Sequence, residues 1–140
     1  MRRPLLAVGA IGMALWTLTA CGKDPEACEM IDAIPSVSVT WQVDELPYDD
    51  GSSYRLCVGA RCETGAPRVY GDTVRVSLRL PDGFDERRQE VRLRLSGPQD
   101  APELDESRTV TLREARAGCD KALIGTLRLT ADGALEERGR

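Results

Sequence analysis

The hydrophobic and polar residues of this chain follow two different patterns. Residues 5–20 form an uncharged stretch, whereas most later apolar residues alternate one by one with polar residues. Successive side chains of a β-strand point to opposite faces, so this alternation predicts strands that are buried on one side only. The alternating apolar sets are Val37, Val39, Trp41 and Val43; Val74, Val76, Leu78 and Leu80; Val91, Leu93 and Leu95; Val110 and Leu112; and Leu127 and Leu129.

Residues typical of tight turns separate these segments, namely Asp50-Gly51, Gly59-Ala60, Pro81-Asp82-Gly83 and Asp132-Gly133. About seven short strands with this spacing predict an all-β domain, an antiparallel two-sheet sandwich of immunoglobulin-like or transthyretin-like architecture. A single curled barrel is the alternative. Residues 44–53 and 96–107 are expected to be loops, and residues 112–122 suit a helical turn before the last strand.

The uncharged N-terminal stretch predicts a signal peptide. Arg2 and Arg3 precede it, and the sixteen residues 5–20 would form a helix about 24 Å long. This length falls short of the roughly 30 Å hydrocarbon core of a bilayer, which argues against a permanent transmembrane helix. The small residues Thr19 and Ala20 suit cleavage by a signal peptidase.

Leu18-Thr19-Ala20-Cys21 resembles the lipobox of bacterial lipoprotein precursors. In that family the cysteine thiol receives a diacylglyceryl group, and the chain is cut before the cysteine. The resemblance implies that Cys21 begins the mature protein and is held at the extracytoplasmic face of the cell membrane by fatty acyl chains such as palmitate. The chain then divides into a signal peptide (1–20), a lipidated cysteine with a tether (21–34) and a β-sandwich domain (35–140). An ordinary secretory signal is the alternative.

The cysteine count agrees with this interpretation. Five cysteines are present, and assigning Cys21 to lipid leaves four that can pair in an oxidising compartment. In the segment RLCVGARCE, Gly59 takes the first central position of a two-residue hairpin, as a type II′ turn requires. Cys57 and Cys62 then lie opposite each other, with Cα atoms about 4.5 Å apart, which a disulfide accepts. Elimination leaves a second bridge between Cys28 and Cys119. A redox or metal site at the first pair is disfavoured, because its spacing is not C-x-x-C.

The overall pattern resembles the small lipoproteins of high-GC Gram-positive bacteria. The resemblance rests on residues 18–21, on the hairpin that carries Cys57 and Cys62, and on Cys119 followed by a strand and the segment ADGALEE. It implies anchoring at the outer face of the membrane and a β-domain. It implies no activity, so Cys21 is the one functional residue that it assigns.

Charge and composition exclude several classes of function. The chain has a formal net charge of −4, and loss of residues 1–20, which carry two arginines and no acid, makes it −6. An acidic domain is a poor partner for nucleic acid. The chain has no histidine, which excludes Ser-His-Asp and Cys-His catalysis and histidine-bearing zinc sites. We therefore predict no catalytic residue, no cofactor and no metal.

The acidic segment VDELPYDDG is a candidate cation site. Its carboxylates, from Asp44, Glu45, Asp49 and Asp50, are oxygen ligands of the kind that calcium prefers. The segment lacks the alternating spacing and the glycine of an EF-hand loop. A solvated surface loop is therefore the preferred interpretation.

Two sets of side chains are candidates for binding. Arg75 and Arg79 share one face of a predicted strand, and Arg92 and Arg94 share one face of the next. If Pro81-Asp82-Gly83 leads the turn between these strands, the four guanidinium groups form a stripe that could contact phosphate or carboxylate polymers. The preferred interpretation is a solvated outer face on which Glu90 and neighbouring acids are the partners of the arginines. The second set is a sugar-stacking platform made of Trp41, Tyr48, Tyr54 and Tyr70, but Trp41 shares the apolar face of its strand and is expected in the core.

These observations favour a membrane-anchored, non-enzymatic binding or scaffold module of the cell envelope, whose partner is an envelope ligand or protein. The alternative is an envelope hydrolase that uses carboxylates alone. A cleft with two facing carboxylates and a perturbed pKa would favour the hydrolase.

Overall fold

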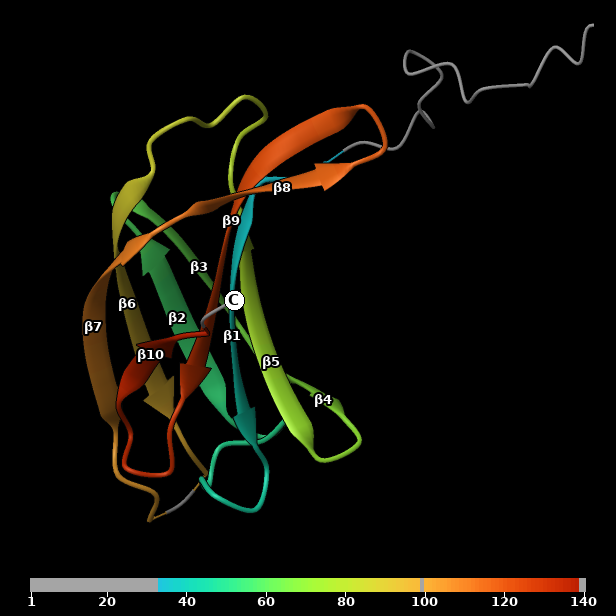
Figure 1. Cartoon of the computed structure of the whole chain (residues 1–140). Coiled ribbons are helices and arrows are strands. Elements are labelled where there is room, and N and C mark those ends of the chain that lie inside the picture. Colours follow the sequence, from blue (N-terminus) through green and yellow to red (C-terminus); the bar gives the residue numbers. More distant parts are fainter. Residues whose placement is uncertain (1–32, 99, 139–140) are drawn as a thin grey trace, which may run out of the picture.

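The computed structural model describes residues 33–98 and 100–138, and the predicted signal peptide, Cys21 and Cys28 lie outside them. The described chain forms ten β-strands in two sheets (Figure 1), which confirms the predicted all-β sandwich. Sheet A contains β10 (Leu135–Glu137), β9 (Asp120–Leu129), β1 (Ser36–Gln42), β5 (Thr73–Arg79) and β4 (Arg68–Tyr70) in this order, and β8 (Arg113–Ala117) also pairs with β9. Sheet B contains β3 (Arg61–Gly65), β2 (Ser53–Val58), β6 (Arg88–Ser96) and β7 (Leu104–Thr111).

Antiparallel pairing dominates both sheets. Within the described residues the one parallel pair is β1 with β9, in which Val39 lies beside Leu127. All other pairs, including β1 with β5 and β2 with β6, are antiparallel. No helix in the described part of the chain is long and apolar enough to cross a bilayer.

The core lies between the inner faces of the two sheets. The alternation seen in the sequence holds for most apolar sets, because strands of each sheet send every second side chain toward the other sheet. The fully buried side chains include Val37, Val39, Trp41, Val74, Leu56, Val91, Leu93, Leu95, Leu127 and Leu129. Val43 is the exception: β1 ends at Gln42, and Val43 is 37% exposed where its N–H donates to the carbonyl oxygen of Asp72.

The expected hairpin between residues 73–80 and 91–95 does not form. β5 pairs with β1 and β4 in sheet A, whereas β6 pairs with β2 and β7 in sheet B. The segment after Pro81 therefore crosses from one sheet to the other. Strands of both sheets bury an apolar face against the same core, so alternation alone does not assign a strand to its sheet.

The expected helical turn at residues 112–122 is also wrong, since this segment forms the hairpin of β8 and β9. Gly118 turns the chain with a positive φ of 58°. Leu112, fully buried, lies where the chain leaves β7 in sheet B and enters β8 in sheet A, a crossing that Figure 1 shows. Its N–H donates to the carbonyl oxygen of Arg87 at 2.6 Å. The expected loop at 96–107 is shorter than predicted, because β7 begins at Leu104 and pairs with β6.

Candidate functional site

The hairpin of β2 and β3 carries the predicted disulfide. Cys57 and Cys62 are direct register partners, their Sγ atoms are 2.09 Å apart and their Cα atoms are 4.0 Å apart. Gly59 has a φ of +57°, and Ala60 is not among the described residues with a positive φ, so the turn has the predicted type II′ signature. Cys119 is also disulfide-bonded. Its predicted partner, Cys28, lies outside the described residues, so that pairing stays a prediction.

The four arginines singled out in the sequence do not form one stripe. Arg75 and Arg79 lie on the outer face of sheet A, whereas Arg92 and Arg94 lie on the outer face of sheet B. The single-stripe prediction is wrong because it placed β5 beside β6. The two arginine pairs therefore belong to two separate surfaces of the sandwich.

On sheet B the arginines are engaged by neighbouring carboxylates. Arg92 donates from Nε and Nη2 to the two carboxylate oxygens of Asp105 at 2.8 and 2.6 Å. These hydrogen bonds hold the pKa of Asp105 below its usual range and raise the pKa of Arg92. Arg94 lies 3.4 Å from Glu103 and 3.7 Å from Asp105. On the outer face of sheet B, Arg92 and Arg94 thus both have carboxylates as counter-charges.

On sheet A the surroundings of the arginines differ. Arg68 and Arg128, which sequence reasoning missed, lie in the same cross-strand row as Arg75 and Thr40. Arg79 lies 3.7 Å from Asp82, and Arg128 lies 3.6 Å from Glu45. Among the described residues, neither Arg68 nor Arg75 forms an ion pair. Alternation placed Arg128 outward, but only the pairing of β9 with β1 and of β4 with β5 brings these residues into one row.

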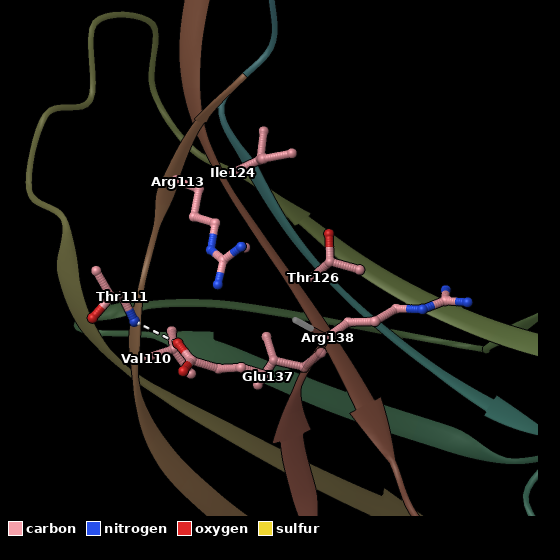
Figure 2. A pocket seen from close by; sticks show the side chains of 9 residues that line it. Val110, Thr111, Arg113, Ile124, Thr126, Glu137 and Arg138 are labelled. Carbon is pink, nitrogen blue, oxygen red and sulfur yellow. Dashed lines mark hydrogen bonds between the residues drawn. The ribbon is translucent and has the colours of Figure 1, made fainter. Parts of the chain in front are cut away.

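A pocket of about 210 Å³ opens beside this face, where the chain that crosses from β7 to β8 separates from β9 and β10 (Figure 2). Arg113 points into it, and the Glu137 carboxylate accepts a hydrogen bond of 2.7 Å from the backbone N–H of Thr111. The backbone N–H of Arg138 donates to the carbonyl oxygen of Thr126. Val110, Ile124, Gly125 and Leu127 complete the lining. The pocket thus brings the opposite charges of Arg113 and Glu137 to one apolar hollow, and its described lining pairs no nucleophile with a base.

A second hollow, of about 430 Å³, adjoins the first. It shares Glu137 and Arg138 with the pocket of Figure 2 and extends over the outer face of sheet A to Thr40, Thr73, Arg128 and Glu136. The two hollows therefore connect the strand crossing to the arginine row. Glu136 is the register partner of Arg128, so its side chain lies on the same outer face as the arginines.

The four aromatic residues considered as a candidate sugar-stacking platform do not form one surface, and the preferred placement of Trp41 in the core is confirmed. The indole Nε1 of Trp41 donates to the carbonyl oxygen of Tyr48 at 2.9 Å. Tyr48 is buried as well, its hydroxyl donates to the carbonyl oxygen of Pro102, and burial raises its pKa. Tyr54 is half-buried, and its pKa is raised by burial and by Glu63. Tyr70 is 57% exposed and stands on the outer face of sheet A opposite Thr73.

The acidic loop does not gather its carboxylates around one point. Glu45 pairs with Arg128, and Asp49 uses Oδ1 to accept the N–H of Gly51 at 2.9 Å. In the described ranges, no three carboxylate, cysteine or histidine groups come close enough together to hold a metal ion. The buried side chain of Tyr48 fixes the middle of this loop to the end of the sandwich.

Comparison of the chain with models of protein families, with curated protein sequences and with solved structures finds no significant match.

Proposed function

We propose that the protein is a lipid-anchored module of the cell envelope, and that its sandwich domain binds a ligand or partner and catalyses no reaction. The N-terminal pattern supports the location: a positive start, a short uncharged segment and Cys21 at its end. The predicted tether, residues 21–34, then leads to the sandwich, whose first strand β1 begins at Ser36.

The binding role is supported by the location of the charged side chains. Apolar side chains from both sheets fill the interior, and the charged side chains are displayed on the broad outer faces of the sheets and on their loops. Exposed outer faces of sheets suit contact with an extended partner better than they suit enclosure of a reacting group. We place this contact on the outer face of sheet A, where Arg68 and Arg75 form no ion pair with any other described residue.

Anchoring is tested by metabolic labelling of cells with an alkyne analogue of palmitate. We expect the wild-type protein to be labelled and to sediment with membranes, and Cys21→Ala to lose both properties. Cys28→Ala is the matched control and should keep the label. Undiminished labelling of Cys21→Ala would contradict the lipid anchor.

Binding is tested by chemical cross-linking of the anchored protein in its own membranes, followed by purification in detergent and identification of the captured material. We expect one reproducible captured partner or envelope polymer. Turnover of an envelope glycan or peptide by the purified full-length mature protein, lost when a single carboxylate is changed to its amide, would overturn the non-enzymatic role.

A further inference from the structure

The outer faces of the two sheets differ in whether carboxylates lie beside a pair of arginines that face each other across two strands. Each face has a pair of arginines that are direct register partners: Arg55 and Arg94 on sheet B, and Arg68 and Arg75 on sheet A. Like charges directly opposite each other in a sheet are unfavourable. On sheet B, Glu103 and Asp105 lie beside Arg94 and relieve the repulsion.

On sheet A no such relief comes from within the described chain. Arg68 and Arg75 are both exposed and neither forms an ion pair there. An anion from outside can bridge the two guanidinium groups, because each offers several N–H donors in a planar fork. The arrangement is therefore one that an anionic ligand would stabilise.

The arginines belong to a row that runs across four strands. Arg128 on β9, Thr40 on β1, Arg75 on β5 and Arg68 on β4 are successive register partners. With strands about 4.8 Å apart, the row is about 14 Å long. Arg128, at one end, lies 3.6 Å from Glu45 and has Glu136 as its register partner. Within the described residues, the arginines of the row that form no ion pair are therefore at the Arg68–Arg75 end.

The middle of the face carries hydroxyl and amide groups in place of charges. Ser36, Thr40 and Gln42 of β1 alternate outward, with Thr73 and Ser77 beside them on β5. Thr126 of β9 lies on the other side of β1. Such groups both donate and accept hydrogen bonds, as sugar hydroxyls do. Tyr70, beside Thr73 and 57% exposed, offers an aromatic ring at the edge of the same face.

We infer that the outer face of sheet A binds a linear acidic polysaccharide, whose acid groups contact Arg68 and Arg75 while its sugar rings lie over the hydroxyl-bearing centre of the face and against Tyr70. This inference rests on the proposed binding role of the domain and specifies its ligand. Charge complementarity at one end of the row selects an anion. The hydroxyl groups and the exposed ring select a sugar polymer over a simple polyanion.

The test is calorimetric titration of the full-length mature protein in detergent with polygalacturonate oligosaccharides, with neutral dextran and with inorganic polyphosphate as comparison polymers. We expect polygalacturonate to bind at low salt and to bind more weakly at high salt, because salt screens exposed charges. Dextran should not bind. Arg68→Gln/Arg75→Gln should weaken polygalacturonate binding about tenfold or more, since charge-assisted hydrogen bonds are lost.

The matched control is Arg55→Gln/Arg94→Gln, which removes the same charge from an equivalent facing pair on sheet B. It should leave binding unchanged, and equal loss in the two variants would overturn the assignment to sheet A. Tyr70→Ala should weaken polygalacturonate binding several-fold and leave polyphosphate binding unchanged. If polyphosphate binds as tightly as polygalacturonate and Tyr70→Ala affects neither, the ligand is not a polysaccharide and the inference fails. Arg75→Glu, also at an exposed position, repeats the test should the double variant not fold.

This experiment separates the inference from the proposed function. If cross-linking in membranes captures a partner but polygalacturonate does not bind, the polysaccharide assignment is wrong and the binding role stands. If the protein turns over an envelope substrate, the proposed function itself is wrong, whatever the titration shows.

Discussion

Trp41 and Tyr48 are joined by a buried hydrogen bond of 2.9 Å from the indole Nε1 of the first to the backbone carbonyl oxygen of the second. The bond links the end of β1 to the loop that follows it. The Tyr48 hydroxyl extends the link to the carbonyl oxygen of Pro102, which lies in the loop before β7. The loop that crosses from β1 to β2 and the loop between β6 and β7 are therefore joined to each other and to the core at one end of the sandwich.

Removal of the Tyr48 hydroxyl should loosen this end of the domain. We expect Tyr48→Phe to lower the free energy of unfolding by about 1 kcal/mol, because it removes one hydrogen bond to a carbonyl group. Denaturant unfolding of the purified protein measures this. Tyr54→Phe is the control, since the Tyr54 hydroxyl has no hydrogen bond within the described residues, and it should change the stability much less. A similar loss in both variants would contradict the role given to the Tyr48 hydroxyl.

Gly125 allows Leu112 to fill the core where the chain changes sheets. A Cβ atom at position 125 would lie 2.7 Å from Leu112 Cδ2 and 3.3 Å from Val37 Cγ2. We expect Gly125→Ala to destabilise the domain by about 1–3 kcal/mol through overpacking. A double-mutant cycle tests this contact: thermal unfolding measures the stability of Gly125→Ala, of Leu112→Ala and of the variant with both changes. The double variant should be more stable than the sum of the single effects predicts, and strict additivity would rule out the contact.

The two predicted disulfides should differ in their contribution to stability. Closing the six-residue loop between Cys57 and Cys62 stabilises by roughly 2 kcal/mol in the chain-entropy model, against roughly 4.6 kcal/mol for the 92-residue loop from Cys28 to Cys119. Cys28→Ser/Cys119→Ser should therefore lower the midpoint of denaturation more than Cys57→Ser/Cys62→Ser. Peptide mapping under non-reducing conditions checks the pairing itself, and a crosslink from Cys28 to Cys57 or Cys62 would refute it.

The ion pair on sheet B should be visible in the titration of Asp105. Hydrogen bonds from Arg92 hold the Asp105 pKa below its ordinary value of 3.8, so the carboxylate stabilises the fold above that pH and this contribution disappears as the pH falls through the lowered value. Arg92→Gln should raise the pKa of Asp105 toward the ordinary value, as measured by NMR titration of the side-chain carboxyl carbon. Arg75→Gln, on the other sheet, should leave it where it is. An unchanged Asp105 pKa in Arg92→Gln would contradict the paired geometry.

Local rules were enough to predict most of the strands and one disulfide. Alternation identified the buried faces of β1, β5, β6 and β9, because burial on one side imposes a period of two on any strand. The turn with Gly59 predicted the facing cysteines, since a two-residue hairpin determines its own register. The short strands β4 and β10, with three residues each, gave too few positions for a pattern to be seen.

The sheet to which each strand belongs was decided only by tertiary structure. Both sheets cover the same core, so Val76 of β5 and Leu93 of β6 have the same sequence pattern although their strands never pair. The candidate site depends on this assignment, because Arg68 and Arg75 become neighbours only through the pairing of β4 with β5. A sequence determines that a side chain faces outward through its own periodicity. Long-range strand pairing decides which charged side chains lie beside it on the neighbouring strands. This pairing places the carboxylate of Asp105 beside Arg92, whereas it gives Arg75 no counter-ion within the described chain.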